Sequence, residues 1–347
     1  MKTIGYAAHS KDADLEPFHF ERRDLRSNDV AIDILYCGVC HSDLHTARND
    51  WGQTKYPVVP GHEIIGRVTE VGPDVKNYKK GDNVAVGCMV DSCLECDQCK
   101  ADDEQFCRDG MTATYGGEDR HNGDIQQGGY SKHIVVREEF VLSVSDKLDL
   151  SKAGPILCAG ITTYSPLKEH NVGKGSRVGI AGLGGLGHMA LKLAKAMGAD
   201  VTVITHSPDK KDEAKEYGAD KVIISSEDDA MEKAAGSLDL IINTVPVKHD
   251  INPYMPLLDV KGTMVMVGQV GPVEEPNIAP MIMGRRSVQG SLIGGIKDTQ
   301  EVLDFCAKHD IHPKCEMVEM DDINDVFSRL KEGSVAHRIV IDMESFK

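Results

Sequence analysis

The first part of the chain alternates short apolar runs with glycine, proline and charged residues. Such runs favour β-strands rather than helices, because they are only a few residues long and turn-forming residues bound them. The pattern predicts an irregular, partly barrel-like β domain over residues 1–153. The expected strands span residues 30–36, 64–71, 83–86 and 130–136.

From Ser176 onward the rhythm changes. Apolar strand-like segments now alternate with longer stretches of helical character, as a parallel, doubly wound sheet requires. We therefore expect a second, α/β domain over residues 154–292. Its expected strands span residues 176–181, 201–205, 221–225, 238–245 and 262–267.

The first helix of this second domain has the clearest periodicity. Apolar residues recur at steps of three and four from Leu186 to Met197, and Gly198 follows as a stop signal. Beyond residue 292 the sequence predicts a helix over residues 299–309 and a last strand over 338–343. We expect residues 293–347 to return to the first domain and complete it.

Composition narrows the class of protein. The 347 residues are 41% hydrophobic, which is ordinary for a globular protein and ample for two domains. The apolar runs are too short to span a bilayer, and the N-terminus lacks the apolar core of a secretory signal. A net charge of −16 disfavours nucleic acid as a partner. We expect a cytoplasmic protein that binds neither membranes nor nucleic acids.

Four of the ten cysteines form a compact cluster with the spacing C-x2-C-x2-C-x7-C. Cysteines so close in sequence can surround one tetrahedral ion, and several neighbouring acidic residues keep the loop solvated. Disulfides or free thiols are the alternatives, and a reducing compartment favours metal over both. The sequence therefore predicts a structural zinc site, closed by four ligands. The cluster comprises Cys93, Cys96, Cys99 and Cys107.

A second set of possible ligands is scattered along the chain. Cys40, His62 and Cys158 each lie in a turn-rich segment, and Glu63 follows His62 directly. Three such ligands are the number and type that hold a catalytic zinc with one position open. A lone cysteine or histidine is more often buried packing than a ligand, so spacing alone does not decide. The remaining cysteines lack this context and are interpreted as structural: Cys37, Cys88, Cys306 and Cys315.

A glycine-rich loop, Gly182-Leu183-Gly184-Gly185-Leu186-Gly187, joins a predicted strand to the periodic helix. In that context the backbone N–H groups and the helix N-terminus can bind a pyrophosphate. The next strand ends Thr205-His206-Ser207 without the acid that usually holds the ribose of NAD, and Lys210 follows. This favours NADP(H) over NAD(H). The alternative is that Lys210 is a solvated helix residue, and Asp209 beside it supports that alternative.

Taken together, the motifs YCGVCHSDLH, YPVVPGHEIIGRV, LCAGITTYSPL, GLGGLGH and GSLIGG, with the four-cysteine cluster, cover essentially the whole chain. The chain resembles the zinc-containing medium-chain dehydrogenase/reductase superfamily, in its cinnamyl alcohol dehydrogenase group with bacterial NADP-dependent aldehyde reductases. The resemblance implies an α/β fold: a GroES-like, β-rich catalytic domain and a Rossmann domain with a doubly wound parallel sheet.

The resemblance also implies roles for individual residues. Cys40, His62 and Cys158 would bind the catalytic zinc, and Glu63 would approach or transiently ligate it. Asp43 would orient His62, while Ser42 and His45 would relay the proton. The implied cofactor contacts are His41, Thr162, Gly182, Leu183, Gly184, Gly185, Leu186, Gly187, Thr205, His206, Ser207, Lys210, Thr244, Gly268, Ser291, Leu292, Ile293 and Arg338.

The expected protein is thus a zinc-dependent alcohol dehydrogenase or aldehyde reductase, with two zinc ions per subunit, NADP(H) as cofactor and a homodimeric state. Where plant members carry a large aromatic residue, this chain has Ala113, so a broader aldehyde range than cinnamyl substrates is expected. The alternatives are an NAD-dependent polyol or secondary-alcohol dehydrogenase and a non-catalytic nucleotide-binding relative. The ligand and relay residues are all present, which disfavours the non-catalytic relative.

Overall fold

The computed structural model describes residues 1–268, 271–335 and 337–346. The chain divides into two compact units, of which unit 1 comprises Met1–Cys158 with Gly294–Lys347 and unit 2 comprises Ala159–Ile293. The first division thus falls after Cys158 rather than after residue 153, so that Cys158 belongs to unit 1. Within the described part of the chain, no helix combines the length and apolarity that a membrane crossing requires.

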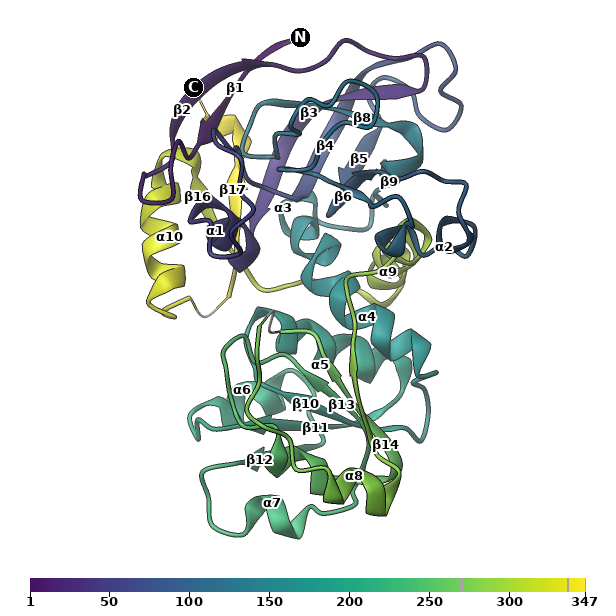
Figure 1. Ribbon diagram of the computed structural model, residues 1–347, viewed down its shortest axis with the longest axis vertical. Coiled ribbons are helices and arrows are strands. Elements are labelled where there is room, and N and C mark those ends of the chain that lie inside the picture. Colours follow the sequence, from purple (N-terminus) through teal and green to yellow (C-terminus); the bar gives the residue numbers. More distant parts are fainter. Residues whose placement is uncertain (269–270, 336, 347) are drawn as a thin grey trace. The chain divides into compact units, whose positions relative to one another are not determined.

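Unit 1 is built on a seven-stranded sheet with the order β16-β17-β3-β4-β5-β9, in which β8 also pairs with β3 (Figure 1). Two small antiparallel pairs, β1–β2 and β6–β7, accompany it. The strands of the large sheet are rich in apolar residues, and most of their side chains are buried. The strands are β1 Lys2–Ala7, β2 Glu16–Glu21, β3 Asp29–Val39, β4 Glu63–Val71, β5 Asn83–Val86, β6 Met89–Asp91, β7 Thr112–Ala113, β8 His133–Arg137, β9 Leu142–Ser143, β16 Cys315–Glu319 and β17 Arg338–Asp342.

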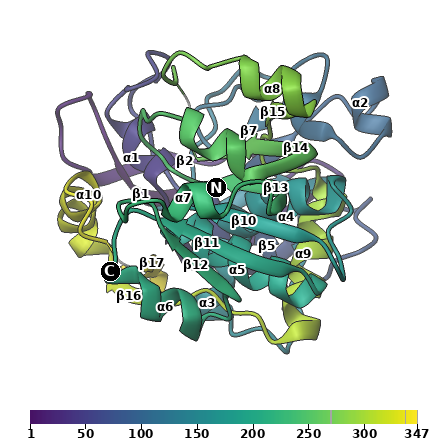
Figure 2. The same ribbon diagram turned by 90° about the horizontal axis from the view of Figure 1, so that it is seen from below.

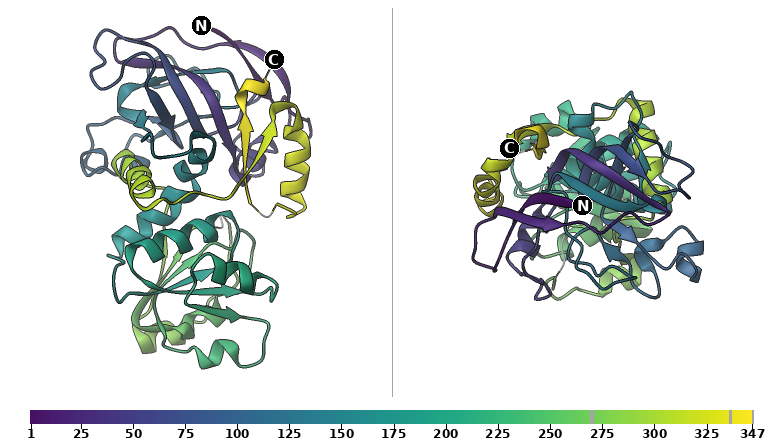
Figure 3. Two further views of the ribbon diagram at one scale, coloured as in Figure 1. Left: turned by 180° about the vertical axis from the view of Figure 1, so that it is seen from behind. Right: turned by 90° about the horizontal axis from the view of Figure 1, so that it is seen from above.

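The C-terminal segment returns to this sheet. The strand β17 pairs antiparallel with β3, with Ile339 opposite Val39, and parallel with β16 (Figure 3). Its apolar residues Ile339, Val340 and Ile341 are buried, so hydrophobic burial holds the segment in place. The helices of unit 1 are α1 His41–Ala47, α2 Asp97–Lys100, α3 Leu150–Ala153, α9 Ile296–His309 and α10 Ile323–Lys331, with 3-10 turns η1 Glu104–Phe106, η2 Glu138–Phe140, η3 Gly154–Leu157, η5 Met320–Asp322 and η6 Met343–Ser345.

One predicted strand begins later than the sequence indicates. The sequence predicts a strand from Tyr130, but the ladder with β3 begins at His133. Residues 128–130 instead lie along residues 59–61, with backbone hydrogen bonds of 2.7 to 2.9 Å. Gly129 permits this approach, because a Cβ atom there would lie 2.5 Å from the side chain of Ile64. We call residues 127–130 the strap.

Unit 2 contains a six-stranded parallel sheet with the order β12-β11-β10-β13-β14-β15 (Figure 2). The five predicted strands are confirmed with small shifts at their ends, while the edge strand β15 was not predicted. The strands are β10 Arg177–Ala181, β11 Asp200–Thr205, β12 Lys221–Ile224, β13 Leu238–Asn243, β14 Leu258–Met266 and β15 Ser287–Gly290. The helices are α4 Ala159–Glu169, α5 Gly185–Met197, α6 Lys210–Glu216, α7 Ala230–Lys233 and α8 Ala279–Gly284, with the 3-10 turn η4 Asn252–Leu257.

The periodic helix is α5, and its predicted end is confirmed. Gly198 has φ of 97°, and its N–H group bonds to the carbonyl groups of Ala194 and Lys195. Glycine suits this left-handed position because it has no Cβ atom to clash with the backbone. The buried stripe from Met189 to Ala194 packs α5 against the sheet, which fixes the loop that precedes the helix.

Candidate active site and cofactor loop

Three elements of unit 1 bring the scattered ligand candidates together. Cys40 is the N-cap residue of α1, His62 directly precedes β4, Glu63 is the first residue of β4, and Cys158 follows η3. One ligand atom from each of the four residues lies within 4.8 Å of all the others, and all four residues are buried. Folding has therefore gathered two sulfurs, one imidazole nitrogen and one carboxylate oxygen, a donor set that suits zinc.

The two sulfur atoms have the spacing of neighbouring zinc ligands. Cys40 Sγ and Cys158 Sγ are 3.8 Å apart, and two thiolates at tetrahedral positions around zinc are separated by about 3.8 Å. A hydrogen bond from the Cys158 thiol lowers the pKa of Cys40 well below its ordinary value. Cys88, which the sequence assigned to packing, lies beside them and donates to the carbonyl of Leu157 at 3.5 Å.

Asp43 orients the imidazole. The Nδ1 atom of His62 lies 2.9 Å from Asp43 Oδ1, and the carboxylate is fully buried. Asp43 also accepts the backbone N–H groups of Cys40, at 2.9 Å, and Gly61, at 3.2 Å. Because Nδ1 is engaged, Nε2 of His62 remains for a metal, as is usual for ligating histidines.

Glu63 forms a buried ion pair with Arg338 through its Oε1 atom. Its other oxygen, Oε2, has no hydrogen-bond partner among the described residues. Burial raises the pKa of Glu63 to about 7, against the attraction of Arg338. A buried carboxylate oxygen without a partner fits a nearby cation. Arg338, which the resemblance assigned to the cofactor pyrophosphate, has this ion pair in unit 1.

The residues expected to relay protons lie on α1. The Cys40 thiol donates to the Ser42 hydroxyl oxygen at 3.7 Å, so Ser42 lies beside the ligand group. The side chain of His45 is 40% exposed, and its Nδ1 atom lies 2.8 Å from Asp50. His41, the first residue of α1, is exposed. Ser42 and His45 thus lie on one helix, the first near the ligand group and the second open to solvent.

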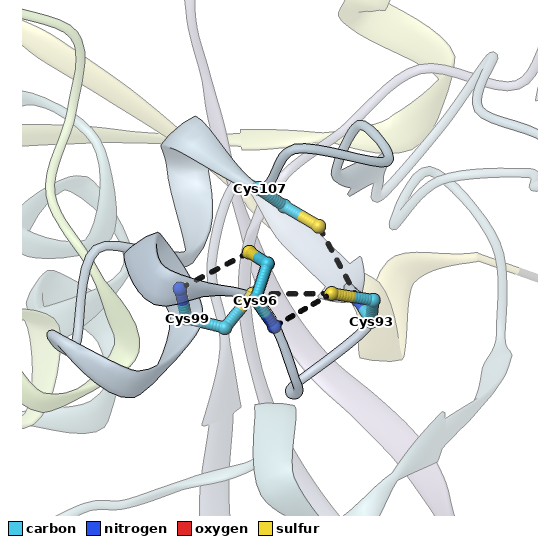
Figure 4. A group of neighbouring side chains, drawn as sticks. All are labelled: Cys93, Cys96, Cys99 and Cys107. Atoms are coloured by element: carbon cyan, nitrogen blue, oxygen red, sulfur yellow. Dashed lines mark hydrogen bonds between the residues drawn. The ribbon is translucent and has the colours of Figure 1, made fainter.

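The four-cysteine cluster forms a separate lobe around α2, and its sulfur atoms face one another (Figure 4). Their ligand atoms also lie within 4.8 Å of one another, with Cys93 and Cys99 separated by 3.8 Å between sulfurs. Backbone N–H groups of Arg108 and Cys99 donate to Cys96 and lower its pKa to about 6. N–H groups that point at sulfur stabilise thiolates, so the lobe suits a bound cation.

In unit 2 the expected cofactor residues follow the carboxyl ends of successive parallel strands. Gly182 follows β10, Thr205 ends β11, Thr244 follows β13, Gly268 lies beyond β14 and Ser291 follows β15. In an open α/β sheet this edge binds the ligand where the strand order reverses, here around β10. Leu292 and Ile293 come directly after Ser291, and Thr162 is buried on α4.

The glycine-rich loop has the predicted strand-loop-helix context. Gly182 adopts φ of 89° after β10, and α5 begins at Gly185. A Cβ atom at Gly187 would lie 2.1 Å from the Gly182 carbonyl oxygen, so the loop and helix pack too closely for a side chain. A Cβ atom at Gly184 would meet nothing within 4 Å, which leaves room for a ligand to approach the backbone.

Past the end of β11, His206 and Ser207 are exposed, and the segment contains no carboxylate before Asp209. Lys210 begins α6 and pairs with Glu213, at 2.7 Å between Nζ and Oε2. The exposed groups beside β11 are therefore an imidazole and a hydroxyl, and the lysine has a partner on its own helix.

Known proteins match the chain over its whole length. The family described as alcohol dehydrogenase GroES-like domain matches residues 26–146, and the family described as zinc-binding dehydrogenase matches residues 185–308. The NADP-dependent alcohol dehydrogenase C 1 of Mycolicibacterium smegmatis is 49% identical over 100% of both chains. A probable mannitol dehydrogenase of Mesembryanthemum crystallinum is 48% identical over 99% of this chain and 95% of its own.

The chain belongs to the zinc-binding alcohol dehydrogenase family. Solved structures place it near the cinnamyl alcohol dehydrogenase group of that family. A cinnamyl alcohol dehydrogenase from Sorghum bicolor has a TM-score of 0.95 with 43% identity, covering 99% of this chain and 98% of its own. The Helicobacter pylori member complexed with NADP(H) has a TM-score of 0.92 with 44% identity, covering 99% of both chains. The GroES-like domain and the Rossmann domain are thereby confirmed.

Sequence reasoning missed the residues around Asp43 in this dehydrogenase. The Tyr130 hydroxyl donates to Asp43 Oδ2 at 2.9 Å, and the Tyr115 ring lies 5.6 Å from that of His62. Neither tyrosine is near His62 in sequence: Tyr115 lies in a loop without periodicity, and Tyr130 stands at the start of a predicted strand. No local signal could have identified them, because the contacts depend on how the loops fold back.

Proposed function

We propose that this protein is a zinc-dependent alcohol dehydrogenase or aldehyde reductase that uses NADP(H) and acts on primary alcohols and aldehydes. One observation carries the proposal: Cys40, His62, Glu63 and Cys158 offer four buried ligand atoms within 4.8 Å of one another. The same chain holds a glycine-rich loop of phosphate-binding geometry. Membership of the family and the names of the relatives support the reaction class.

The donor sets fit two zinc ions per subunit. Both groups bring sulfur atoms to 3.8 Å, the separation of about 3.8 Å that tetrahedral thiolate ligation gives. The buried group offers Cys40, His62 and Cys158 as ligands, with Glu63 as an additional or transient one. The lobe offers four thiolates and leaves no position for a substrate. We therefore assign catalysis to the buried group and loop stability to the lobe.

When bound, zinc supplies Lewis acidity toward an alcohol or aldehyde oxygen, and the nicotinamide cofactor supplies or accepts the hydride. The residues of the chain then have distinct tasks. Cys40, His62 and Cys158 hold the ion, and Asp43 keeps His62 in the ligating tautomer. The Ser42 hydroxyl exchanges a proton with the substrate oxygen, and the exposed imidazole of His45 exchanges it with solvent.

For the cofactor, we propose that the glycine-rich loop of residues 182–187 binds the pyrophosphate. His206, Ser207 and Lys210 would then meet a 2′-phosphate, and Lys210 would exchange its pairing with Glu213 for the phosphate. His41, Thr162, Thr205, Thr244, Gly268, Ser291, Leu292, Ile293 and Arg338 are proposed to complete the contacts. The NADP-dependent relatives support this cofactor.

We also propose a homodimer formed through the sheets of unit 2. Strand β15 ends the described sheet order, and the neighbouring α8 exposes Ile282 to 75% and Met283 to 88%. Unpaired strand edges and large exposed apolar side chains are features of association surfaces. Light scattering should give the mass of two chains, and the variant Ile282→Lys should give the mass of one.

The proposal is tested by turnover and metal content measured on the same preparation. Reduction of benzaldehyde and of butanal is assayed with NADPH and with NADH. Oxidation of a polyol is assayed with NADP and with NAD. We expect aldehyde reduction with NADPH and two zinc equivalents per chain. Polyol oxidation with NAD alone would instead identify the polyol dehydrogenase alternative. Fully active protein with one metal, held in the lobe, would overturn the proposal, and absence of any turnover would favour a non-catalytic relative.

A further inference from the structure

We infer that Tyr130 is a positioning residue for the buried metal group and acts through Asp43. The strap of residues 127–130 holds the hydroxyl of Tyr130 against that carboxylate. The inference rests on the proposed zinc site and goes beyond it, because Tyr130 contacts no ligand candidate through a side-chain hydrogen bond of its own. It acts instead on the carboxylate that holds His62.

The surroundings of Asp43 assign this role. Its Oδ1 atom accepts from Gly61 N at 3.2 Å and lies 2.9 Å from His62 Nδ1. Its Oδ2 atom accepts from Cys40 N at 2.9 Å and from the Tyr130 hydroxyl at 2.9 Å. Each oxygen thus has two partners, and the buried carboxylate is fixed in orientation. Of these four partners, the Tyr130 hydroxyl alone comes from outside the segments that carry the ligands. Burial together with the nearby Asp43 carboxylate also raises the pKa of the Tyr115 phenol.

The hydroxyl is a reliable donor at this position. Tyr130 is fully buried, and burial together with the charge of Asp43 raises its pKa well above the ordinary value. The phenol therefore keeps its proton, and hydrogen bonds to ionised groups are among the stronger ones in proteins. Loss of this bond would leave Asp43 freer to rotate, and the imidazole of His62 would follow.

The strap is built close against the segment that leads to His62. Gly128 N donates to Val59 O at 2.7 Å, and Tyr130 N donates to Pro60 O at 2.9 Å. A Cβ atom at Gly128 would lie 2.3 Å from the Pro60 carbonyl oxygen, so this approach requires glycine. The strap and residues 59–61 are consequently joined by backbone hydrogen bonds into one structural unit. This unit carries Tyr130 and leads directly into His62.

A buried cation anchors the strap from its other side. Arg22 donates through Nη2 to the carbonyl of Gly128 and to the hydroxyl of Ser131, both at 2.8 Å, and through Nε to the carbonyl of His133 at 2.9 Å. Its Nη1 atom donates to Gln127 O. Burial lowers the pKa of Arg22 to about 9. A buried guanidinium whose hydrogen bonds go to neutral carbonyl and hydroxyl oxygens indicates that the conformation of this loop is tightly specified.

The test compares Tyr130→Phe with the matched control Tyr78→Phe. The Tyr78 hydroxyl donates to the carbonyl of Val141 at 2.6 Å, so the control also loses a hydrogen bond of a partly buried tyrosine, but one that does not involve Asp43. Metal release to a chelating dye is followed at neutral pH, and we expect one kinetic phase from each ligand group. The variant Cys158→Ser should lack the phase that belongs to the buried group, which identifies that phase. We expect about tenfold faster release in that phase for Tyr130→Phe, with the lobe phase unchanged.

A cobalt-substituted form supplies a second readout. The absorption of cobalt in the buried group should shift in Tyr130→Phe and not in Tyr78→Phe, because the ligand field follows the orientation of His62. Equal release rates and equal spectra in the two variants would overturn the role of Tyr130. Wild-type protein with a lobe metal alone would overturn the proposed zinc site as well.

Should Tyr130→Phe fail to fold, Gln127→Ala takes its place. The Gln127 side chain accepts from Val59 N at 2.6 Å and donates to Pro57 O at 3.2 Å, so the change loosens the strap without touching Asp43. Faster release from the buried group supports the inference, and release at the wild-type rate overturns it.

Discussion

The two ligand groups of unit 1 have similar sulfur spacing but different origins. The lobe gathers its four thiols from a single segment, Cys93 to Cys107, and two of them are partly exposed. The buried group draws Cys40 and Cys158 from positions 118 residues apart and adds His62 and Glu63 at the start of a strand. A local loop can thus make a closed metal site. The buried group, for which we propose an open position, instead draws its residues from rigid elements of different parts of the fold.

Electrostatics separates the two groups further. In the lobe, backbone N–H groups point at sulfur, and solvent can reach Cys93 and Cys96. In the buried group, charges are balanced by side chains: Asp43 faces His62, and Arg338 faces Glu63. A buried charge without its partner is costly. Substitutions in the buried group should therefore change chemistry, while those in the lobe should change stability.

The largest effect on turnover is expected for Cys158→Ser. Removal of one of three protein ligands forfeits several kcal/mol of Lewis-acid stabilisation, so turnover should fall by more than about a thousandfold. Cofactor binding, which we assign to unit 2, should persist, and metal analysis should find one equivalent. Wild-type turnover in a variant without metal in the buried group would contradict the assignment.

Asp43→Asn should have the next largest effect. The amide cannot accept from His62 and the three other donors as a carboxylate does, so the metal affinity of the buried group or the turnover should fall by about 10- to 100-fold. Equilibrium titration with zinc measures the affinity directly. The lobe metal serves as the internal control, and equal losses from both groups would indicate general unfolding instead.

Cys96→Ser should separate stability from chemistry. A structural zinc contributes on the order of 10 kcal/mol to ordering such a loop, so the variant should unfold at lower temperature and be cleaved by protease within residues 93–107. At low temperature its turnover should stay within a few-fold of wild type. Cys315→Ser, at a half-buried thiol outside both groups, is the matched control and should leave both properties unchanged.

The smallest effect is expected for Asp97→Asn on the surface of the lobe. Hydrogen bonds from Arg108 hold the pKa of Asp97 well below its ordinary value, and both side chains are more than 60% exposed. Turnover and both metals should be unchanged, because exposed ion pairs contribute little. A folded-state pKa below the unfolded one stabilises the protein above about pH 4, and that stabilisation is lost as the pH falls further. Any difference in unfolding temperature should therefore be greatest near neutral pH in low salt, and should shrink on acidification.

Much of the fold could be predicted because it follows from local pattern. The five predicted strands of unit 2, β10 to β14, the helix α5 and its stop at Gly198 are confirmed. Each has an apolar run or a helical period that burial in one sheet explains. The sequence did not indicate β1, β2, β15 or β16, which lie at sheet edges or in small pairs. Edge strands bury fewer side chains, so their apolar pattern is weaker.

The candidate site divides in the same way. The lobe and the glycine-rich loop are contiguous motifs, and their spacing carries the geometry. The contacts of Asp43 with Tyr130, of Glu63 with Arg338, and of Lys210 with Glu213 could not be predicted. The first two contacts join residues far apart in the chain. In the third, the sequence left open whether Lys210 faces a cofactor phosphate or an acidic residue of its own helix.

By itself, the sequence determined the ligand types, the phosphate-binding loop and the alternation of strands and helices, because these depend on side-chain chemistry and on periods of a few residues. Tertiary structure alone decided which distant side chains meet. It also decided that a strap follows residues 59–61 where the sequence predicts the start of a strand, and that a tyrosine supports the carboxylate behind His62. Contacts of this kind depend on close packing between chain segments, which no short stretch of sequence encodes.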